Sequence, residues 1–304
     1  MDKKTLKIYG AALLFSVLVG FTFIGVKVIT EIGTTLEILT YRYNFAFLGT
    51  AVLVIFGSKK MRFKAKDKKN LAYTAIFYIL FMVLQAAGLV YTTSIVSGII
   101  FSLIPIIAKV IASVYLGEQT TGLQNLFVLI SVSALIVMIL LDAKEINTNV
   151  WGILLLLLSS TAMAISNVFM RFVRKSYTPL EISFAISLLG FAAFNLVTLV
   201  LGLKNGSIMG HLLLSQNLVF MVASAYLGIF CTLLTSFLMS YSLAHLEAVK
   251  ATMFGNLSTA ISLIAGAILL SEPLKYYHVL CTLLIIIGVA GVSVFGKKRT
   301  PETH

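Results

Sequence analysis

Long apolar stretches, separated by short polar ones, run along the whole chain. A helix needs about 20 consecutive, mostly apolar residues to cross the hydrocarbon core of a bilayer. We therefore expect an all-α integral membrane protein with ten transmembrane helices. The stretches lie at 7–29, 36–57, 70–92, 95–116, 121–141, 150–172, 179–202, 217–242, 248–270 and 274–295.

The composition excludes several classes of protein. Of the 304 residues, 59% are apolar and 11% are charged, and the mean hydropathy is +1.02. A soluble domain averages about 45–50% apolar and about 25% charged residues, so the chain has too much apolar surface for one soluble core. The net charge of +12 suggests nucleic-acid binding. Because the positive residues sit between apolar stretches, we reject a nucleic-acid partner and expect the lipid bilayer instead.

Residues that bind metals or carry catalysis are few and scattered. Cys231 and Cys281 each lie inside an apolar stretch and form no Cys-x-x-Cys pair, so we interpret them as small apolar residues. The four histidines show no HExxH-like pairing. A GxxxxGK[ST] loop for ATP is also absent from the sequence. We expect no metal, no cofactor and no catalytic residue.

Lysine and arginine are concentrated in alternate connections. Cytoplasmic loops of membrane proteins carry an excess of these residues. With ten spans, sixteen of them fall on one side, whereas the opposite connections carry only Lys144, Lys204 and Lys275, with Lys27 near that surface. Both termini are therefore predicted to be cytoplasmic. The sixteen are Lys3, Lys4, Lys7, Lys59, Lys60, Arg62, Lys64, Lys66, Lys68, Lys69, Arg171, Arg174, Lys175, Lys297, Lys298 and Arg299.

The first stretch resembles a signal peptide only in its basic start. Its apolar run is too long, and no small-residue cleavage site follows before Glu31. We interpret it as a retained helix. The compact loops and the lack of a targeting leader favour a multi-pass protein of the bacterial plasma membrane.

Two pairs of motifs indicate an internal repeat. Thr34 and Glu37 form a Thr-x-x-Glu capping box before the second stretch, and Thr178 and Glu181 repeat it 144 residues later. Leu116-Gly117-Glu118 likewise matches Leu270-Ser271-Glu272, 154 residues on. The chain thus divides into halves of five helices at 1–143 and 148–297, with a cytoplasmic tail at 298–304. Five is odd, so the second half is predicted to be inverted, as in many secondary transporters.

Small and polar residues form a stripe along the fourth stretch. Gly98, Ser102, Pro105, Lys109 and Ala112 are spaced by three or four residues and so share one helical face. Lipid does not favour small polar residues, so the stripe is expected to face protein or water. Tight helix packing is the alternative for its small residues. Pro105 lacks an amide hydrogen, so the helix is predicted to bend there.

Several other polar residues lie within the stretches, and we list them with Ser102 and Lys109 as candidates for a substrate cavity. A lysine midway along a span costs at least about 2.5 kcal/mol on insertion scales, so Lys109 needs a partner or a wet cavity. For Arg42, a structural tie to a carbonyl or carboxylate stands beside binding of a substrate carboxylate. For Gln85 and Asn167, a structural bond between helices is the alternative. The ninth stretch adds Asn256 and Thr259, and the eighth adds Thr235 within a stripe of Ser224, Gly228, Thr232, Thr235, Met239 and Ser242.

No carboxylate lies deep in any stretch. Exporters of cationic drugs and proton-coupled carriers usually need a buried acid, whereas the mid-membrane charges here are Arg42 and Lys109. Both are positive, so they favour a small anionic or zwitterionic solute that carries a carboxylate. Glu118 and Glu247 could tilt inward from the helix ends.

Several of these motifs resemble those of the EamA-domain family, within the drug/metabolite transporter superfamily. The resemblance rests on 87–92 (AGLVYT), 102–105 (SLIP) and 116–118 (LGE), and on Arg42, which sits where that family often has an arginine in its second helix. The second half repeats the pattern more weakly, with Asn256-Leu257 and 271–274 (SEPL). The resemblance covers nearly the whole chain.

The resemblance implies ten helices in two inverted repeats around a central cavity, and export of small metabolites such as amino acids. This chain departs from the pattern at three positions. Thr259 stands where the second repeat often has proline, Ser271 replaces the usual glycine, and Lys109 is not part of the pattern.

We therefore expect a secondary transporter that exports a small polar metabolite by alternating access and is not an enzyme. An exporter of drugs or other cations is the alternative within the same class. A ligand-binding sensor and a membrane-embedded enzyme are alternatives from other classes. The sequence leaves open the substrate, the coupling ion and the oligomeric state.

Overall fold

The computed structural model describes residues 3–29, 32–56, 67–91, 100–142, 149–206, 213–269 and 275–295. The regular secondary structure in these ranges is helical. Eight helices follow predicted stretches closely: α1 (Lys3–Ile29), α2 (Thr35–Phe56), α3 (Lys68–Tyr91), α6 (Gly122–Asp142), α7 (Val150–Val173), α8 (Pro179–Asn205), α12 (Ala248–Leu269) and α13 (Tyr276–Val294).

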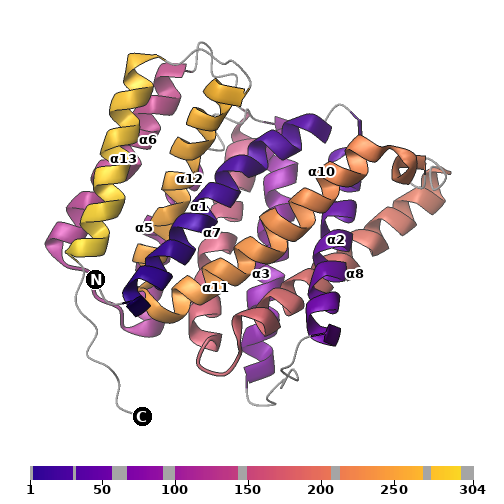
Figure 1. Cartoon of the computed structure of the whole chain (residues 1–304), viewed down its shortest axis with the longest axis horizontal. Coiled ribbons are helices and arrows are strands. Elements are labelled where there is room, and N and C mark those ends of the chain that lie inside the picture. Colours follow the sequence, from indigo (N-terminus) through magenta and orange to yellow (C-terminus); the bar gives the residue numbers. More distant parts are fainter. Residues whose placement is uncertain are drawn as a thin grey trace.

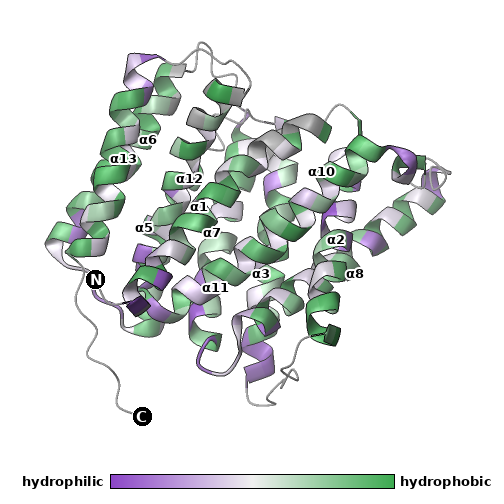
Figure 2. Cartoon of the chain, viewed as in Figure 1, coloured by the Kyte–Doolittle hydropathy of each residue, from purple (hydrophilic) through white to green (hydrophobic). Residues whose placement is uncertain are grey.

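The described ranges contain seven helical segments that are long and apolar enough to cross a membrane. Two shorter apolar helices, 104–116 and 122–138, accompany them. Figure 1 shows long helices packed side by side, with α6 and α13 together at one edge. In Figure 2, hydrophobic colour runs along the helices, and hydrophilic colour gathers toward many of their ends and connections. The described residues therefore form an all-α membrane architecture. The sequence predicted ten spans, of which seven are found among these residues.

The fourth apolar stretch is not one continuous helix in its described part. Helical backbone at residues 100–101 is followed by a turn at Ser102 and Leu103, and α5 (Ile104–Leu116) begins directly afterwards. Pro105 lies in the first turn of α5, where its missing amide hydrogen costs no helical bond. The chain is therefore interrupted before Pro105 rather than bent at it, and Ser102 does not share one unbroken helical face with Lys109.

The eighth apolar stretch contains a π-helical segment. α10 (Leu218–Gly228) passes into the π-helix η3 (Ile229–Leu234) and then into α11 (Thr235–His245), preceded by a short 3-10 turn, η2 (Leu214–Gln216). A π-helix bonds residue i to residue i+5 and often marks a functional site. The stripe predicted from Ser224 to Ser242 is therefore divided by a change of register.

Both predicted capping boxes are formed. The Glu37 carboxylate accepts the Thr34 amide hydrogen at 2.7 Å, and the Thr34 hydroxyl accepts the Glu37 amide hydrogen at 3.4 Å. Thr178 and Glu181 repeat the exchange at 2.7 and 3.3 Å. These bonds satisfy amide groups that a helix start leaves unpaired, so they determine where α2 and α8 begin.

Helices at equivalent places in the two predicted halves run antiparallel. Between α2 and α8, Thr40 bonds Thr198 at 2.8 Å, while Thr50, further along α2, bonds Ser187 at 2.9 Å. Residue numbers rise on one helix as they fall on the other. In the α6–α13 pair, Thr121, just before α6, bonds the carbonyl of Phe295 just after α13.

Hydrogen bonds between connections assign the helix ends to two groups. At one end, Glu118, between α5 and α6, bonds Arg171 near the end of α7 and the amide of Ala248 at the start of α12. Thr121 and Phe295 also meet there. We call this the Glu118 end.

The other group of helix ends contains Tyr91, and we call it the Tyr91 end. The amide of Asn149, before α7, bonds the Tyr91 carbonyl at the end of α3 at 3.4 Å. The Tyr277 hydroxyl, at the start of α13, bonds the Leu141 carbonyl near the end of α6 at 3.3 Å. The described helices thus pass back and forth between two ends.

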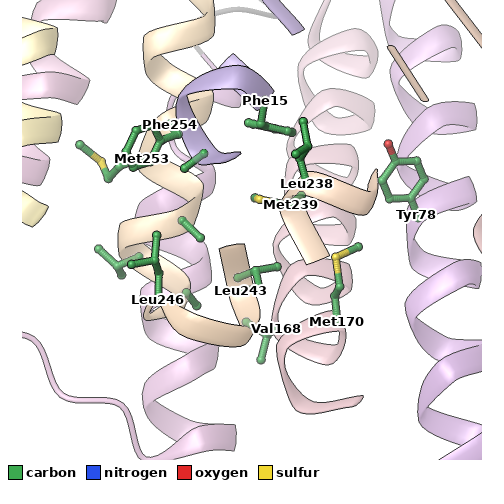
Figure 3. Packing of buried hydrophobic residues seen from close by; sticks show 14 of the residues in the cluster. Phe15, Tyr78, Val168, Met170, Leu238, Met239, Leu243, Leu246, Met253 and Phe254 are labelled. Carbon is green, nitrogen blue, oxygen red and sulfur yellow. The ribbon is translucent and has the colours of Figure 1, made fainter. Parts of the chain in front are cut away.

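Apolar side chains fill the space between α1, α7, α11 and α12. Figure 3 shows Phe15, Leu238, Leu243, Met170 and Phe254 in this region, and all five are buried. The same cluster extends to α3, α6, α8 and α13. Buried apolar surface excludes water here, so any polar group in the interior has to find its partner within the protein.

A close backbone approach joins α10 to α2 at Gly228. A Cβ atom at Gly228 would lie 2.5 Å from the Arg42 carbonyl oxygen and 2.9 Å from the Ala46 amide nitrogen. Backbone atoms cannot move aside as a flexible side chain does. Gly255, also inside a helix, has nothing within 4 Å of the same position.

We expect Gly228→Ala to destabilise the protein by about 1–3 kcal/mol, because it forces α2 and α10 apart. Gly255→Ala is the matched control, and its expected effect is neutral or stabilising by up to about 1 kcal/mol, since alanine favours a helix. Thermal unfolding in detergent, followed by circular dichroism, measures both. Equal unfolding midpoints for the two variants would contradict the close approach.

Candidate functional site

Arg42 is the one cation in α2. Its side chain is buried, with 8% of the residue exposed. Nε donates to the Thr232 hydroxyl at 2.5 Å, and Nη2 donates to the Cys231 carbonyl at 3.0 Å. Both acceptors belong to η3. Of the two roles predicted for Arg42, a tie to a carbonyl is therefore present.

Two successive residues of the π-helical η3, Cys231 and Thr232, provide these acceptors. The Cys231 carbonyl accepts from Arg42 and also from the Thr235 hydroxyl at 2.9 Å. The Thr232 hydroxyl itself donates to the Leu227 carbonyl at 3.0 Å. Thr235, a predicted cavity residue, is thus buried and bonded within its own helix.

Both partners of Arg42 are neutral oxygens. The carboxylates in the described residues all lie at or beyond helix ends, at Glu37, Asp67, Glu118, Asp142, Glu181 and Glu247. No ion pair of Arg42 is present among the described residues. A guanidinium stays protonated in proteins, so the positive charge of Arg42 is not paired with a carboxylate among the described residues.

Some buried polar atoms near the centre of the bundle make no hydrogen bond within the described protein. They include the hydroxyl of Tyr43, next to Arg42 in sequence, and the side-chain oxygen of Asn167 on α7. A buried donor or acceptor without a partner costs about 1–3 kcal/mol. Water or a polar solute is the usual partner for such groups. The others on the helices of this region are the hydroxyls of Ser224, Ser240 and Ser242.

Lys109 lies away from Arg42. It is half-buried in α5, and its Nζ donates to the Asn125 side-chain oxygen at 2.7 Å. Asn125 also accepts from Thr120, in the α5–α6 connection at the Glu118 end. The partner that Lys109 requires is therefore an amide on α6, a contact that the stripe pattern did not indicate.

The remaining predicted residues are distributed over several helices. Asn256 on α12 is buried and lies 3.5 Å from the Ser131 hydroxyl on α6. Ser102 is buried in the turn before α5, and Gln85 is half-buried on α3. Thr259 lies in α12, with its side chain outside the described part. Asn256 thus contacts α6, whereas Arg42 contacts η3.

The Glu118 end holds a buried ion pair that the candidate residues did not include. Arg171 Nε donates to one Glu118 oxygen, and the amide of Ala248 donates to the other at 2.9 Å. Arg171 Nη1 donates to the carbonyls of Leu243 and Leu246. The Arg171 and Glu118 side chains are 4% and 14% exposed, which is low for charged groups at a helix end.

A pocket of ≈ 140 Å³ adjoins this pair. One water requires about 10–15 Å³ of such volume, so the pocket has room for a small polar group. Arg174 Nη1 donates to the Tyr177 carbonyl, while its buried Nε makes no hydrogen bond. Burial lowers the pKa of Arg174, and the nearby Glu181 carboxylate opposes that shift. The lining residues are Leu116, Glu118, Arg171, Phe172, Arg174, Lys175, Leu243 and Ala244.

The sequence marked Glu118 and Arg171 separately but did not indicate that they contact each other. Glu118 ended a repeated Leu-x-Glu motif, and Arg171 counted only as one of the cytoplasmic cations. The partners are 53 residues apart in the chain. The sequence left open that Glu118 and Glu247 tilt inward from the helix ends, and each has partners at this end. Gln124 donates to Glu247 at 3.0 Å, and Lys250 lies 3.6 Å from it.

The described residues contain no group of three or more His, Cys, Asp or Glu side chains placed to hold a metal. Cys231 and Cys281 are buried free thiols, as their apolar surroundings predicted.

The chain belongs to the EamA-like transporter family, whose sequence model matches residues 6–140 and again 150–294. It is therefore a multi-pass membrane protein of a transporter family, and the family resemblance predicted from the motifs is confirmed.

The "uncharacterized transporter YcxC" of Bacillus subtilis (strain 168) is 33% identical over 294 residues, which cover 96% of this chain and 94% of that protein. An "uncharacterized transporter" of Archaeoglobus fulgidus is 28% identical over 273 residues, 89% of this chain and 92% of that one.

A protein of known crystal structure has the same fold. The TM-score is 0.74 and the superposition covers 97% of each chain, at 12% sequence identity. At that identity the likeness concerns the fold alone.

We expect Thr232→Val to destabilise the protein by about 1–3 kcal/mol, because valine keeps the shape but leaves Arg42 Nε without an acceptor. Thr161→Val is the matched control. Its hydroxyl bonds a carbonyl of its own helix, Leu157, at 2.8 Å, so the expected effect is within about 0.5 kcal/mol. Thermal unfolding in detergent measures both variants, and equal stability would show that the Arg42–Thr232 bond contributes nothing.

Proposed function

We propose that the protein is a secondary transporter that moves a small carboxylate-bearing solute, such as an amino acid, out of the cell by alternating access. The family establishes a membrane transporter. The substrate class, the direction and the mechanism are the additions made here.

The buried Arg42 carries the proposal for the substrate. It is bonded to a hydroxyl and a backbone carbonyl, and no described carboxylate is paired with it. Its planar guanidinium fits a carboxylate with two parallel hydrogen bonds. The unpaired Tyr43 hydroxyl on the same helix is a further donor. A solute carboxylate would compensate the charge that the protein leaves unbalanced.

Two inverted repeats with ten crossings are the proposed basis of alternating access. The two family matches, at 6–140 and 150–294, fall in the predicted halves 1–143 and 148–297. The antiparallel pairs α2–α8 and α6–α13 join helices at equivalent positions of those halves. In such transporters the halves move against each other around a site at their interface.

The Glu118 end is proposed to face the cytoplasm, with both termini on that side of the plasma membrane. Basic residues at this end support the assignment. Lys68 and Lys69 begin α3, and Arg171, Arg174 and Lys175 lie where α7 ends. Outward transport rests on the family resemblance.

The alternative cargo is a drug or another cation. The described carboxylates lie at helix ends and not beside Arg42, which argues for an anionic group on the cargo. An enzyme or a sensor has no support in the family or in its named relatives.

Exchange in liposomes tests the function. Purified protein is reconstituted with a mixture of amino acids, small organic acids and cationic drugs inside, and the external solution is analysed by mass spectrometry. Selective release of carboxylate-bearing solutes is expected. Arg42→Gln should weaken it by about tenfold or more, because a hydrogen bond to a charged group contributes about 1.5–3 kcal/mol.

Two further variants show whether the loss is specific to the proposed site. Lys204→Ala removes an exposed cation at the end of α8 and should transport normally. Lys109→Ala tests the other cation predicted to lie midway along a span, and unchanged transport would exclude it from the cavity. Release of cationic drugs alone, or equal transport by Arg42→Gln and Lys204→Ala, would overturn the carboxylate proposal.

A further inference from the structure

One ion pair connects four helices at the Glu118 end. Glu118 follows α5, and its carboxylate binds Arg171 of α7 and the first amide of α12. Arg171 in turn binds the carbonyls of Leu243 and Leu246, where α11 ends. The pair therefore joins the predicted first half to the second. While it is intact, α5, α7, α11 and α12 are held together at this end.

The pocket beside the pair has more positive than negative groups. Among the described residues, Arg171, Arg174 and Lys175 line it together with a single carboxylate, Glu118. Both Glu118 oxygens are engaged, one by Arg171 and one by Ala248. Arg174 Nε is buried and has no hydrogen-bond partner in the described part of the chain. The pocket thus offers charge and a free donor to an anionic group, next to the guanidinium that Glu118 already binds.

We propose that this pocket is the entry site for the carboxylate of the transported solute, and that Glu118 is an internal competitor for Arg171. The identity of the anion as the transported solute rests on the proposed function. Binding of a second carboxylate places two like charges around one guanidinium, which is unfavourable in a poorly solvated site. The incoming carboxylate then displaces Glu118 from Arg171, and the Ala248 amide loses its acceptor. The contact between the two predicted halves at this end is broken.

This assignment gives Glu118 and Arg174 different roles. Glu118 closes the end, so its removal should open the end without any ligand. Arg174 leaves the pair intact but helps to hold the incoming anion. Arg174→Gln should therefore keep the end closed and reduce its response to an anion. A purely structural role for the pair predicts no response to anions in either protein.

Accessibility of Ala244, which lines the pocket, measures the opening. We would label Ala244→Cys with a membrane-impermeant maleimide in inside-out vesicles. The native Cys231 and Cys281 are buried, so the labelling of the unmodified protein gives the background. Gln119→Cys, exposed in the same connection as Glu118, controls for reagent access. Succinate is the probe, with neutral succinamide and sodium chloride at equal ionic strength as controls.

Closed protein is expected to label slowly at Ala244→Cys. Adding Glu118→Gln should raise the rate at least about fivefold, with no change at Gln119→Cys. In the protein that retains Glu118, succinate should raise the labelling rate of Ala244→Cys at least about threefold, whereas succinamide and chloride should not. Arg174→Gln should cut the succinate effect by half or more while the rate without succinate stays low.

Two results would overturn the proposal. Equal labelling rates for Ala244→Cys alone and for Ala244→Cys combined with Glu118→Gln would show that the ion pair does not close this end. An increase with succinate no larger than with chloride would show that the pocket is not an anion entry site. Arg171→Lys, which keeps the charge but loses the fork, replaces Glu118→Gln if the latter does not fold, and it should also raise labelling. None of these measurements requires transport, so they stand apart from the exchange assay.

Discussion

The position of Arg42 depends on the close approach of α2 and α10 at Gly228. With no side chain at that residue, the two backbones come within reach of each other, and the guanidinium extends to η3. The π-helical backbone there offers the Cys231 carbonyl and the Thr232 hydroxyl. A cation that would otherwise be prohibitive within a membrane is thus held by neutral dipoles. Among the described residues, no carboxylate is paired with this charge.

Local signals in the sequence predicted much of the fold. The apolar stretches gave the helix positions, since a bilayer requires long apolar segments, and both capping boxes formed at their predicted residues. These features involve neighbours in the chain. The turn at Ser102 and the π-helix were missed, because a periodic stripe assumes one continuous α-helix.

The candidate site was less predictable, because its contacts join distant residues. Hydropathy and spacing indicated that Arg42 and Lys109 needed partners, but not which ones. Those partners are 189 and 190 residues away for Arg42, and 16 away, across a helix connection, for Lys109. The link between Glu118 and Arg171 likewise depends on how the halves pack together. A single sequence carries no periodic signal for such pairs.

The π-helix also makes chain length inside a span a determinant of which residues face the interior. One residue in an α-helix corresponds to a rotation of about 100°. Beyond η3, Ser236 is directed to α8, where it bonds Ser183 at 2.9 Å. The wide turn of η3 takes up one residue more than an α-helical turn, so loss of one residue from 229–234 would restore regular α-helix and leave α11 facing α7 and α8. The same loss from α10 or α11 would turn the helix beyond it by about 100° and bring a different face to α7 and α8. A π-helical turn is thus a place where this span can gain or lose a residue while its interior face is kept.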